Sequence, residues 1–283
     1  MTEPLDGETP SVSAIAPLCV LLPPHASDAL HAEAQHWAEH LGLSLVNLEE
    51  AQENVLHLVP TEKGLELWAG ARRPEGVARV NFMRRAASKS KASRQPLHRA
   101  VGRKAISVVD ATAGFGDDSI ALAHFGHEVF ALEQCSPIAA MFQDARRRAL
   151  SVEVTREAAQ RLSIENADAL HRLRTLESIP DVVYLDPMYT ETGRNTRALP
   201  RIEIQVLRRL VGRTDNALEL FNAAIDSGTS RIVVKRPISA PPLIKPLAAQ
   251  HAGKLARYDV YDPRVFKQKM NLKNSLPTSG ISS

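Results

Sequence analysis

The residues with the most specific chemistry stand near the middle of the chain, in the run VVYLDPMY. An apolar segment over residues 182–185 ends at Asp186, which is followed by Pro187 and then by Tyr189. A carboxylate and a backbone carbonyl at a strand end can accept hydrogen bonds from an amino group, and an aromatic ring can stack on a planar base. Proline has no N–H and a fixed φ, so it shapes the turn without adding a donor. This set can hold an aromatic amine, although an Asp-Pro pair can also simply turn the chain after a strand.

A second candidate is a loop that contains two glycines. Gly114 and Gly116 follow the apolar run that ends at Asp110, and a helix-like segment comes next. Glycine permits a positive φ and a close backbone approach, so the loop suits a nucleotide-like ligand at the carboxyl end of a sheet, or merely a tight turn. Glu133 ends the next apolar run, where a carboxylate can bind both hydroxyls of a ribose. Asp168 follows a third run, in a position to face an adenine amino group.

The loop residues favour S-adenosylmethionine over a dinucleotide. Dinucleotide-binding loops carry a third glycine or alanine, and this chain has Ser119 at that position. Asp117 and Asp118 suit the start of a helix, but they would repel a pyrophosphate. S-adenosylmethionine has no phosphate and carries a sulfonium and an amino group, so acidic residues suit it. The matching reaction is methyl transfer to an amine held at Asp186, which needs in-line positioning and no strong base beforehand.

These residues require a parallel sheet to position them. From residue 106 onward, strand-like apolar runs alternate with helix-like segments. The strands are expected within residues 106–110, 128–133, 161–168, 181–186, 230–237 and 256–263. Such alternation predicts a mostly parallel sheet with helices on both faces and right-handed connections. Because the carboxyl ends of parallel strands share one edge, Asp110, Glu133 and Asp186 should lie together.

The chain divides into four regions by composition. Residues 1–83 are expected to form a small α+β domain, with a helix over 26–41 that stops at Gly42 and several short strands. Residues 84–104 are a basic linker or RNA-contacting segment, and residues 105–265 form the methyltransferase domain. The polar tail, residues 266–283, is expected to be disordered.

The basic segment, residues 84–104, contains many Lys and Arg residues and no acidic residue. Such a block attracts a polyanion, although it can also be a solvated linker. Lys235 and Arg236 close the fifth strand of the sheet, where they can bind RNA phosphate or form salt bridges to acids at the same edge. The predicted RNA-binding residues are Arg84, Arg85, Lys89, Lys91, Arg94, Arg103, Lys235 and Arg236, with Arg99 and Lys104 as further candidates.

The composition bounds the class of protein. The 283 residues are 44% hydrophobic with a formal net charge of +3, enough to bury a sizeable core. Cys19 and Cys135 lie far apart, so the sequence predicts no disulfide framework and no zinc site, which fits the cytoplasm. His36 and His40 could share a helix face, but a third metal ligand is lacking. We expect a soluble protein with no membrane or metal partner, and the sequence carries no signal for an oligomeric state.

Four segments together resemble the RsmJ family. They are DATAGFGDDSIALAHFGHEVFALEQ, VVYLDPMY, RIVVKRPISAPPL and RYDVYDP, and the resemblance covers about residues 80–262. It implies a Rossmann-like class I S-adenosylmethionine-dependent methyltransferase fold, an α/β sheet with helices on both faces. It further implies methylation of a guanine N2 amine in 16S ribosomal RNA or the small ribosomal subunit. The cofactor positions that it implies are Asp117, Asp118, Glu133, Gln134, Asp168, Ala169 and Asp186, in addition to Asp110, Gly114 and Gly116.

Two other functions stay open at this point. One is an amino-methyltransferase that acts on another nucleic acid or on a metabolite, and the basic residues 84–104 argue against the metabolite. The other is a noncatalytic RNA-binding protein on a methyltransferase scaffold. The joint presence of Gly116, Glu133, Asp186 and Tyr189 argues against that second alternative.

Overall fold

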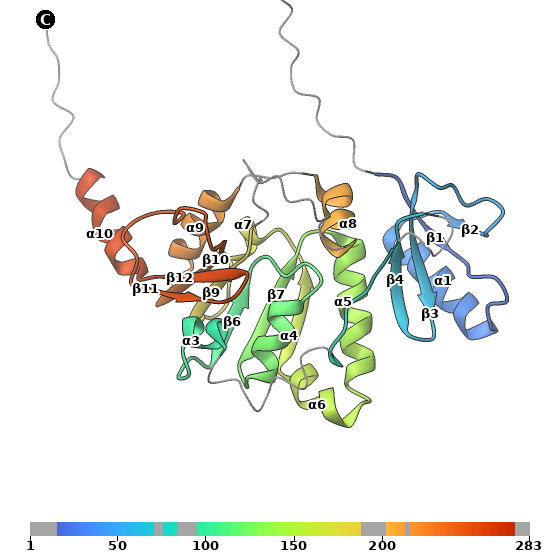
Figure 1. The fold of residues 1–283 in the computed structure, drawn as a ribbon, viewed down its shortest axis with the longest axis horizontal. Helices are drawn as coiled ribbons and strands as arrows, with labels where there is room; N and C mark the ends of the chain where they lie inside the picture. Colours follow the sequence, from blue (N-terminus) through green and yellow to red (C-terminus); the bar gives the residue numbers. More distant parts are fainter. Residues whose placement is uncertain (1–15, 71–75, 84–94, 188–201, 213–215, 275–283) are drawn as a thin grey trace, which may run out of the picture. The chain divides into compact units, whose positions relative to one another are not determined.

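The structure is a computed structural model that describes residues 16–70, 76–83, 95–187, 202–212 and 216–274 (Figure 1). The described residues form two compact units. The first unit holds the residues up to Pro60, together with Leu67–Ala78 and the helix at 202–211. The second unit holds Thr61–Glu66 and the remaining described residues from Arg79 onward.

The first unit contains a five-stranded sheet in the order β2-β1-β3-β4-β5. Its strands are β1 (Leu18–Leu21), β2 (Leu45–Val46), β3 (Leu56–Thr61), β4 (Gly64–Trp68) and β5 (Val77–Ala78). Helix α1 (Asp28–Leu41) begins after Ser27, whose hydroxyl accepts from Leu30 N, and ends at Gly42 with φ of 64°. The helix predicted to stop at Gly42 is thus confirmed. Helix α8 (Ile202–Val211) completes the unit.

The second unit is built on a seven-stranded sheet in the order β11-β12-β10-β9-β6-β7-β8. The strands are β6 (Ser107–Asp110), β7 (Glu128–Glu133), β8 (Leu162–Asn166), β9 (Val182–Leu185), β10 (Arg231–Pro237), β11 (Ala249–Ala252) and β12 (Ala256–Tyr261). Five neighbouring strands, from β10 to β8, run parallel, while β12 is antiparallel to both β10 and β11. The carboxyl ends of β6, β7, β9 and β10 therefore share one edge, which we call the carboxyl edge.

Helices cover both faces of this sheet. They are α3 (Pro96–Val101), α4 (Asp117–His124), α5 (Ser136–Ala149), α6 (Glu153–Gln160), α7 (Ala169–Arg172), α9 (Ala217–Asp226) and α10 (Pro263–Asn274). Val108 packs in one core cluster with residues of α3 to α6, and its neighbour Val109 packs in another with residues of α7, α9 and α10. Successive strand residues point to opposite faces, so a strand buried on both faces reads as a continuous apolar run. The predicted α/β fold class is confirmed.

Helix α10 differs from the tail that the sequence led us to expect. The structure shows regular helix through Asn274, where disorder was expected from residue 266. Asp262 accepts from Arg264 N at 3.0 Å at the start of the helix, and Phe266 is buried against Phe221 at a ring separation of 5.3 Å. Phe266, with the partly buried Val265 beside it, therefore anchors a helix that is rich in Lys and Asn.

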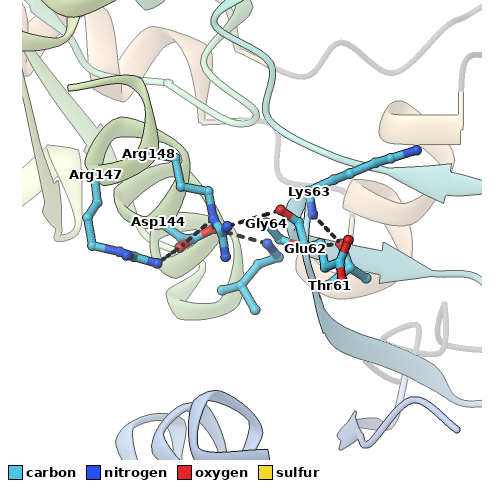
Figure 2. A network of polar contacts seen from close by, with 8 residues as sticks. Thr61, Glu62, Lys63, Gly64, Asp144, Arg147 and Arg148 are labelled. Carbon is cyan, nitrogen blue, oxygen red and sulfur yellow. Dashed lines mark hydrogen bonds and ion pairs between the residues drawn. The ribbon is translucent and has the colours of Figure 1, made fainter. Parts of the chain in front are cut away.

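The segment Thr61–Glu66, which contains the turn between β3 and β4, is fixed to α5 by the buried carboxylate of Asp144 (Figure 2). Asp144 accepts from Leu65 N at 3.0 Å and forms ion pairs with Arg147 at 2.6 Å and Arg148 at 2.9 Å. Both of its oxygens are therefore hydrogen-bonded, as a buried charge requires. These contacts with α5 explain why the segment Thr61–Glu66 belongs to the second unit.

None of the helices in the described ranges is long and apolar enough to cross a membrane.

Candidate active site

The glycine loop joins β6 to α4 at the carboxyl edge. Gly114 and Gly116 have φ of 52° and 77°, in the left-handed region that L side chains avoid. A Cβ at Gly116 would also overlap the ring of Phe142 on α5. Glycine is therefore required at 116 for steric as well as conformational reasons. The absence of a side chain there lets the loop lie close against α5.

Glu133 binds the glycine loop from the tip of β7. Its Oε2 accepts from Gly114 N at 2.8 Å, and its Oε1 accepts from Cys135 N at 2.7 Å. Burial raises the pKa of Glu133, and these backbone hydrogen bonds oppose the rise. A carboxylate has about four acceptor positions, so Glu133 can shape the loop and still accept from a ligand. Gln134 follows it and is exposed.

Asp110 lies beneath the loop and is only 1% exposed. Its carboxylate accepts from Ser119 Oγ at 2.5 Å and from Thr112 N at 3.0 Å. Burial raises the pKa of Asp110 to about 7, against these hydrogen bonds and with a contribution from Asp118 and Asp186. Ser119, noticed in the sequence only as the missing third glycine, is thus the residue that ties α4 to the end of β6.

Four side chains meet beside the loop. Lys235 Nζ lies 2.7 Å from Asp118 Oδ2 and 2.8 Å from Asp186 Oδ2. The Tyr184 hydroxyl also donates to Asp118 Oδ2, at 2.7 Å. The side chain of Asp186 is 36% exposed and that of Lys235 is 26% exposed, whereas Asp118 is 13% exposed. Of the two alternatives for Lys235, phosphate contact or salt bridge, the structure contains the salt bridge.

The pKa values of these four side chains depend on one cation, Lys235, that lies between two carboxylates. Burial, and then the charge of Asp118, raise the pKa of Asp186, while Lys235 acts in the opposite direction. Burial acts to lower the pKa of Lys235, but the two carboxylates outweigh it and hold that pKa well above its ordinary value. Burial and the same carboxylates raise the pKa of Tyr184, which stays a neutral donor.

The Asp-Pro turn is tied to the neighbouring strand. Asp186 N donates to Thr112 Oγ1 at 2.6 Å. This bond links the end of β9 to the glycine loop that follows β6. Pro187 is buried. Tyr189, predicted to stack on a base, lies outside the described residues.

The end of β8 adds two predicted residues and one that sequence reasoning missed. Asp168 is exposed and begins α7, where its Oδ1 accepts from Leu170 N at 2.9 Å, and Ala169 is buried beside it. Asn166 Nδ2 donates to Glu133 O at 2.8 Å and to Gln134 O at 3.1 Å. Asn166 therefore holds the tips of β7 and β8 together, and only its place at a strand end could have signalled this.

The predicted RNA-binding residues separate into three groups. Five of them lie outside the described residues: Arg84, Arg85, Lys89, Lys91 and Arg94. Arg103 is exposed, but it lies between α3 and the start of β6, at the opposite edge of the sheet from Asp186. Arg236 is only 9% exposed, and its Nε donates to Pro241 O at 3.1 Å. Arg236 therefore supports the loop after β10 and does not present its charge to solvent.

The described residues contain no group of three or more His, Cys, Asp or Glu side chains that could hold a metal ion. Cys19 and Cys135 are both free thiols.

The carboxyl edge is acidic and fits the chemistry of S-adenosylmethionine. Asp110, Glu133 and Asp186 end or follow strands at this edge, Asp117 and Asp118 begin α4 there, and Lys235 lies among them. Such a surface favours a cationic ligand that carries hydrogen-bond donors and disfavours a pyrophosphate. The loop with positive φ at two glycines lets the backbone approach that ligand closely.

Comparison with known proteins agrees with this chemistry. A family model described as "Putative SAM-dependent methyltransferase" matches residues 42–263. A Coxiella burnetii protein named Ribosomal RNA small subunit methyltransferase J is 35% identical over 245 residues, which span 84% of this chain and 94% of that protein. A Chromohalobacter salexigens protein of the same name is 41% identical over 167 residues, 57% of this chain and 64% of that protein.

A solved structure extends the likeness to three dimensions. The SAM-dependent methyltransferase NGO1261 from Neisseria gonorrhoeae superposes with a TM-score of 0.63 at 28% sequence identity, over 86% of this chain and 95% of that chain. The family match, the relatives and the shared fold lead to one conclusion: this chain belongs to the RsmJ family of S-adenosylmethionine-dependent methyltransferases.

Proposed function

We propose that this protein methylates the exocyclic N2 amine of a guanine in the 16S ribosomal RNA of the small subunit. One observation carries the proposal: the partly exposed Asp186 carboxylate lies at the same edge as the glycine loop, and the backbone N–H of Asp186 donates to Thr112 in that loop. The names of the relatives support small-subunit ribosomal RNA as the substrate class. An RNA substrate of this kind also supports a cytoplasmic location.

The residues of the loop and the strand ends would hold the cofactor. S-adenosylmethionine supplies an electrophilic methyl carbon when bound. Glu133 would accept from the ribose hydroxyls, while Gly114 and Gly116 keep the backbone close. Gln134, Asp168 and Ala169, at the ends of β7 and β8, would border the adenine. Asp117 and Asp118 would supply negative charge near the amino and sulfonium groups, and the buried Asp110 would support the cofactor loop from beneath.

Asp186 and its neighbours would hold the target base. The lone pair of a guanine N2 amine is delocalised into the ring, so the amine is a poor nucleophile. Asp186 and a backbone carbonyl of the Asp-Pro turn would each accept one amine hydrogen and direct the nitrogen toward the methyl carbon. Tyr189 would stack on the base. After transfer, Asp186 or water takes the proton that the amine sheds.

The basic segment would supply the phosphate contacts for the RNA substrate. The described chain resumes at Gln95, and Pro96 lies beside Gly253 in the turn between β11 and β12. That turn is at the carboxyl edge, because Ala256 pairs with Pro237 at the end of β10. The described chain after residue 94 therefore begins at the edge where the substrate would bind, which supports the five cations between residues 84 and 94 as proposed phosphate contacts.

Methyl transfer in vitro tests the proposal. The purified protein is incubated with radiolabelled S-adenosylmethionine and small subunits, or 16S RNA, from cells that lack this gene. The expected product is labelled N2-methylguanosine in 16S RNA. Label in another nucleoside, or in another nucleic acid only, would contradict the proposed substrate.

A further inference from the structure

Lys235 connects three elements at the carboxyl edge. Its Nζ bridges Asp118, in the first turn of α4, and Asp186, which follows β9, at 2.7 Å and 2.8 Å. The partners are 117 and 49 residues away in the sequence. Within the described ranges, the hydrogen bond given to the Asp186 carboxylate comes from Lys235 Nζ and reaches Oδ2.

We infer that Lys235 is a positioning residue for methyl transfer: by binding Oδ2 of Asp186, it directs Oδ1 toward the target amine. The inference rests on the proposed role of Asp186 as the amine acceptor. A carboxylate at a strand end can rotate about χ1 and χ2, and its two oxygens are otherwise equivalent. An ammonium fixed on one oxygen removes that freedom and sets the direction of the other.

Asp118 and Tyr184 hold Lys235 in place. Asp118 Oδ2 accepts both the ammonium of Lys235 and the hydroxyl of Tyr184, which is fully buried. Asp118 therefore keeps a second restraint when Lys235 is removed, whereas the Asp186 side chain loses the contact that sets its orientation. The substitution should thus affect Asp186 more than it affects Asp118.

The alternative, that Lys235 only stabilises the fold, is weaker on this geometry. Of the two ion pairs of Lys235, the one with Asp186 is the more exposed, with side chains 26% and 36% exposed, so it contributes less to stability than the pair with Asp118, which is 13% exposed. The position is also chemically specific, because the ammonium lies between two carboxylates at the edge where the reaction would occur. A charge at this place controls how readily Asp186 is protonated.

The test compares Lys235→Gln, Lys235→Arg and wild type in the full chain. Lys235→Gln should lower kcat roughly tenfold or more, with the dissociation constant of S-adenosylmethionine changed less than about threefold. Its activity should also fall off at a higher pH on the acid side than that of wild type, because Asp186 loses the cation that favours its charged form. Lys235→Arg keeps the charge, so it should restore the acid limb while kcat stays below wild type.

The exposed Lys267 on α10 provides a matched control, and Lys267→Gln should behave as wild type. A Lys235→Gln enzyme with wild-type kcat and pH profile would overturn the inference. So would a loss of cofactor affinity as large as the loss of kcat, since Lys235 would then belong to the cofactor site. If Lys235→Gln does not fold, Lys235→Arg decides: a lowered kcat supports the inference and an unchanged kcat refutes it.

A measurement without turnover separates this inference from the proposed function. With aspartate labelled by carbon-13 at the carboxyl group, NMR titration follows Asp186 in the free protein, assigned by its loss in Asp186→Asn. The Asp186 titration should move to higher pH in Lys235→Gln and stay near wild type in Lys267→Gln. An unmoved titration removes the basis of the inference, even if the protein methylates 16S RNA. Failure of methylation with a moved titration instead counts against the proposed function.

Discussion

At the scale of single residues, the carboxylates of the carboxyl edge differ in how far they reach solvent. Asp110 is 1% exposed and Glu133 is buried, and both are held by hydrogen bonds from the loop or helix beside them. Asp118 is 13% exposed and Asp186 is 36% exposed. Of these four carboxylates Asp186 is the most exposed, which suits its proposed role at the substrate.

Replacing Asp186 tests its proposed role. Asp186→Ala should lower kcat for methyl transfer by about a hundredfold or more, which is the scale of losing a positioned polar group in a preorganised site. The fold and most of the affinity for S-adenosylmethionine should remain, because Gly114, Glu133 and Asp118 keep their contacts. Single-turnover kinetics and calorimetric titration measure the two quantities. Activity within a fewfold of wild type would refute the role.

Asp110 makes the free energy of unfolding depend on pH. Its folded pKa of about 7 exceeds its ordinary value, so its contribution to stability is greatest below about pH 4 and is lost as pH rises toward 7. Relative to Asp110→Asn, wild type should lose about 2 kcal/mol of stability between pH 5 and pH 7. Urea unfolding of both proteins across this range measures the difference. Parallel stability profiles would mean that Asp110 ionises normally.

At the scale of elements, the glycine loop depends on its packing against α5. Gly116→Ala combines a left-handed φ with overlap on Phe142, and should destabilise the protein by about 2–4 kcal/mol. Gly126 is a matched control, with φ of 99° and no atom within 4 Å of an added Cβ. Gly126→Ala should cost about 1–2 kcal/mol for the backbone alone. If thermal or urea unfolding gave equal losses of stability for the two variants, the Phe142 ring would move aside without a loss of packing energy.

The elements divide clearly into those the sequence could reveal and those it could not. Strands β6, β7, β9 and β10 are buried on both faces, so their apolar runs predicted them and placed Asp186 and Glu133 at one edge. Strand β11 is an exposed edge strand with the sequence AQHA, and it carries no such pattern. Its place in the sheet depends on pairing with β12.

The candidate site shows the same division. Local spacing was sufficient to find the glycine loop, Glu133 and the Asp-Pro turn. The partner of Lys235 could not be chosen from the sequence, because Asp118 and Asp186 lie 117 and 49 residues away and only the fold brings them together. Arg103 and Arg236 were selected for their charge, but charge alone does not tell which edge a residue occupies or whether it is buried.

At the scale of the whole molecule, a formal net charge of +3 conceals an uneven distribution. Acidic residues gather at the carboxyl edge, and unopposed cations gather in residues 84–104. An acidic edge suits the cationic cofactor but repels phosphate, so the proposed RNA substrate would need a separate basic segment to bring it there. The two charge groups thus suit two different ligands of one reaction.

The basic segment can be tested through the salt dependence of RNA binding. Replacing Arg84, Arg85, Lys89, Lys91 and Arg94 with Ser should weaken binding and reduce the slope of log K against log salt by about 3.5–4.5, since each phosphate contact contributes roughly 0.7–0.9. Arg103→Ser, at the opposite edge, should change the slope less than any one of these. Filter binding or fluorescence anisotropy between low and moderate salt gives both slopes. An unchanged slope in the fivefold variant would mark the segment as a solvated linker.

The most direct measurement of the central claim is a mass map of modified nucleotides in 16S ribosomal RNA from cells with and without this gene. The account predicts that one guanine carries an N2-methyl group in the first sample and is unmodified in the second, and that a gene encoding Asp186→Ala does not restore it. Identical maps, or the loss of a methyl group from a different nucleoside atom, would contradict it.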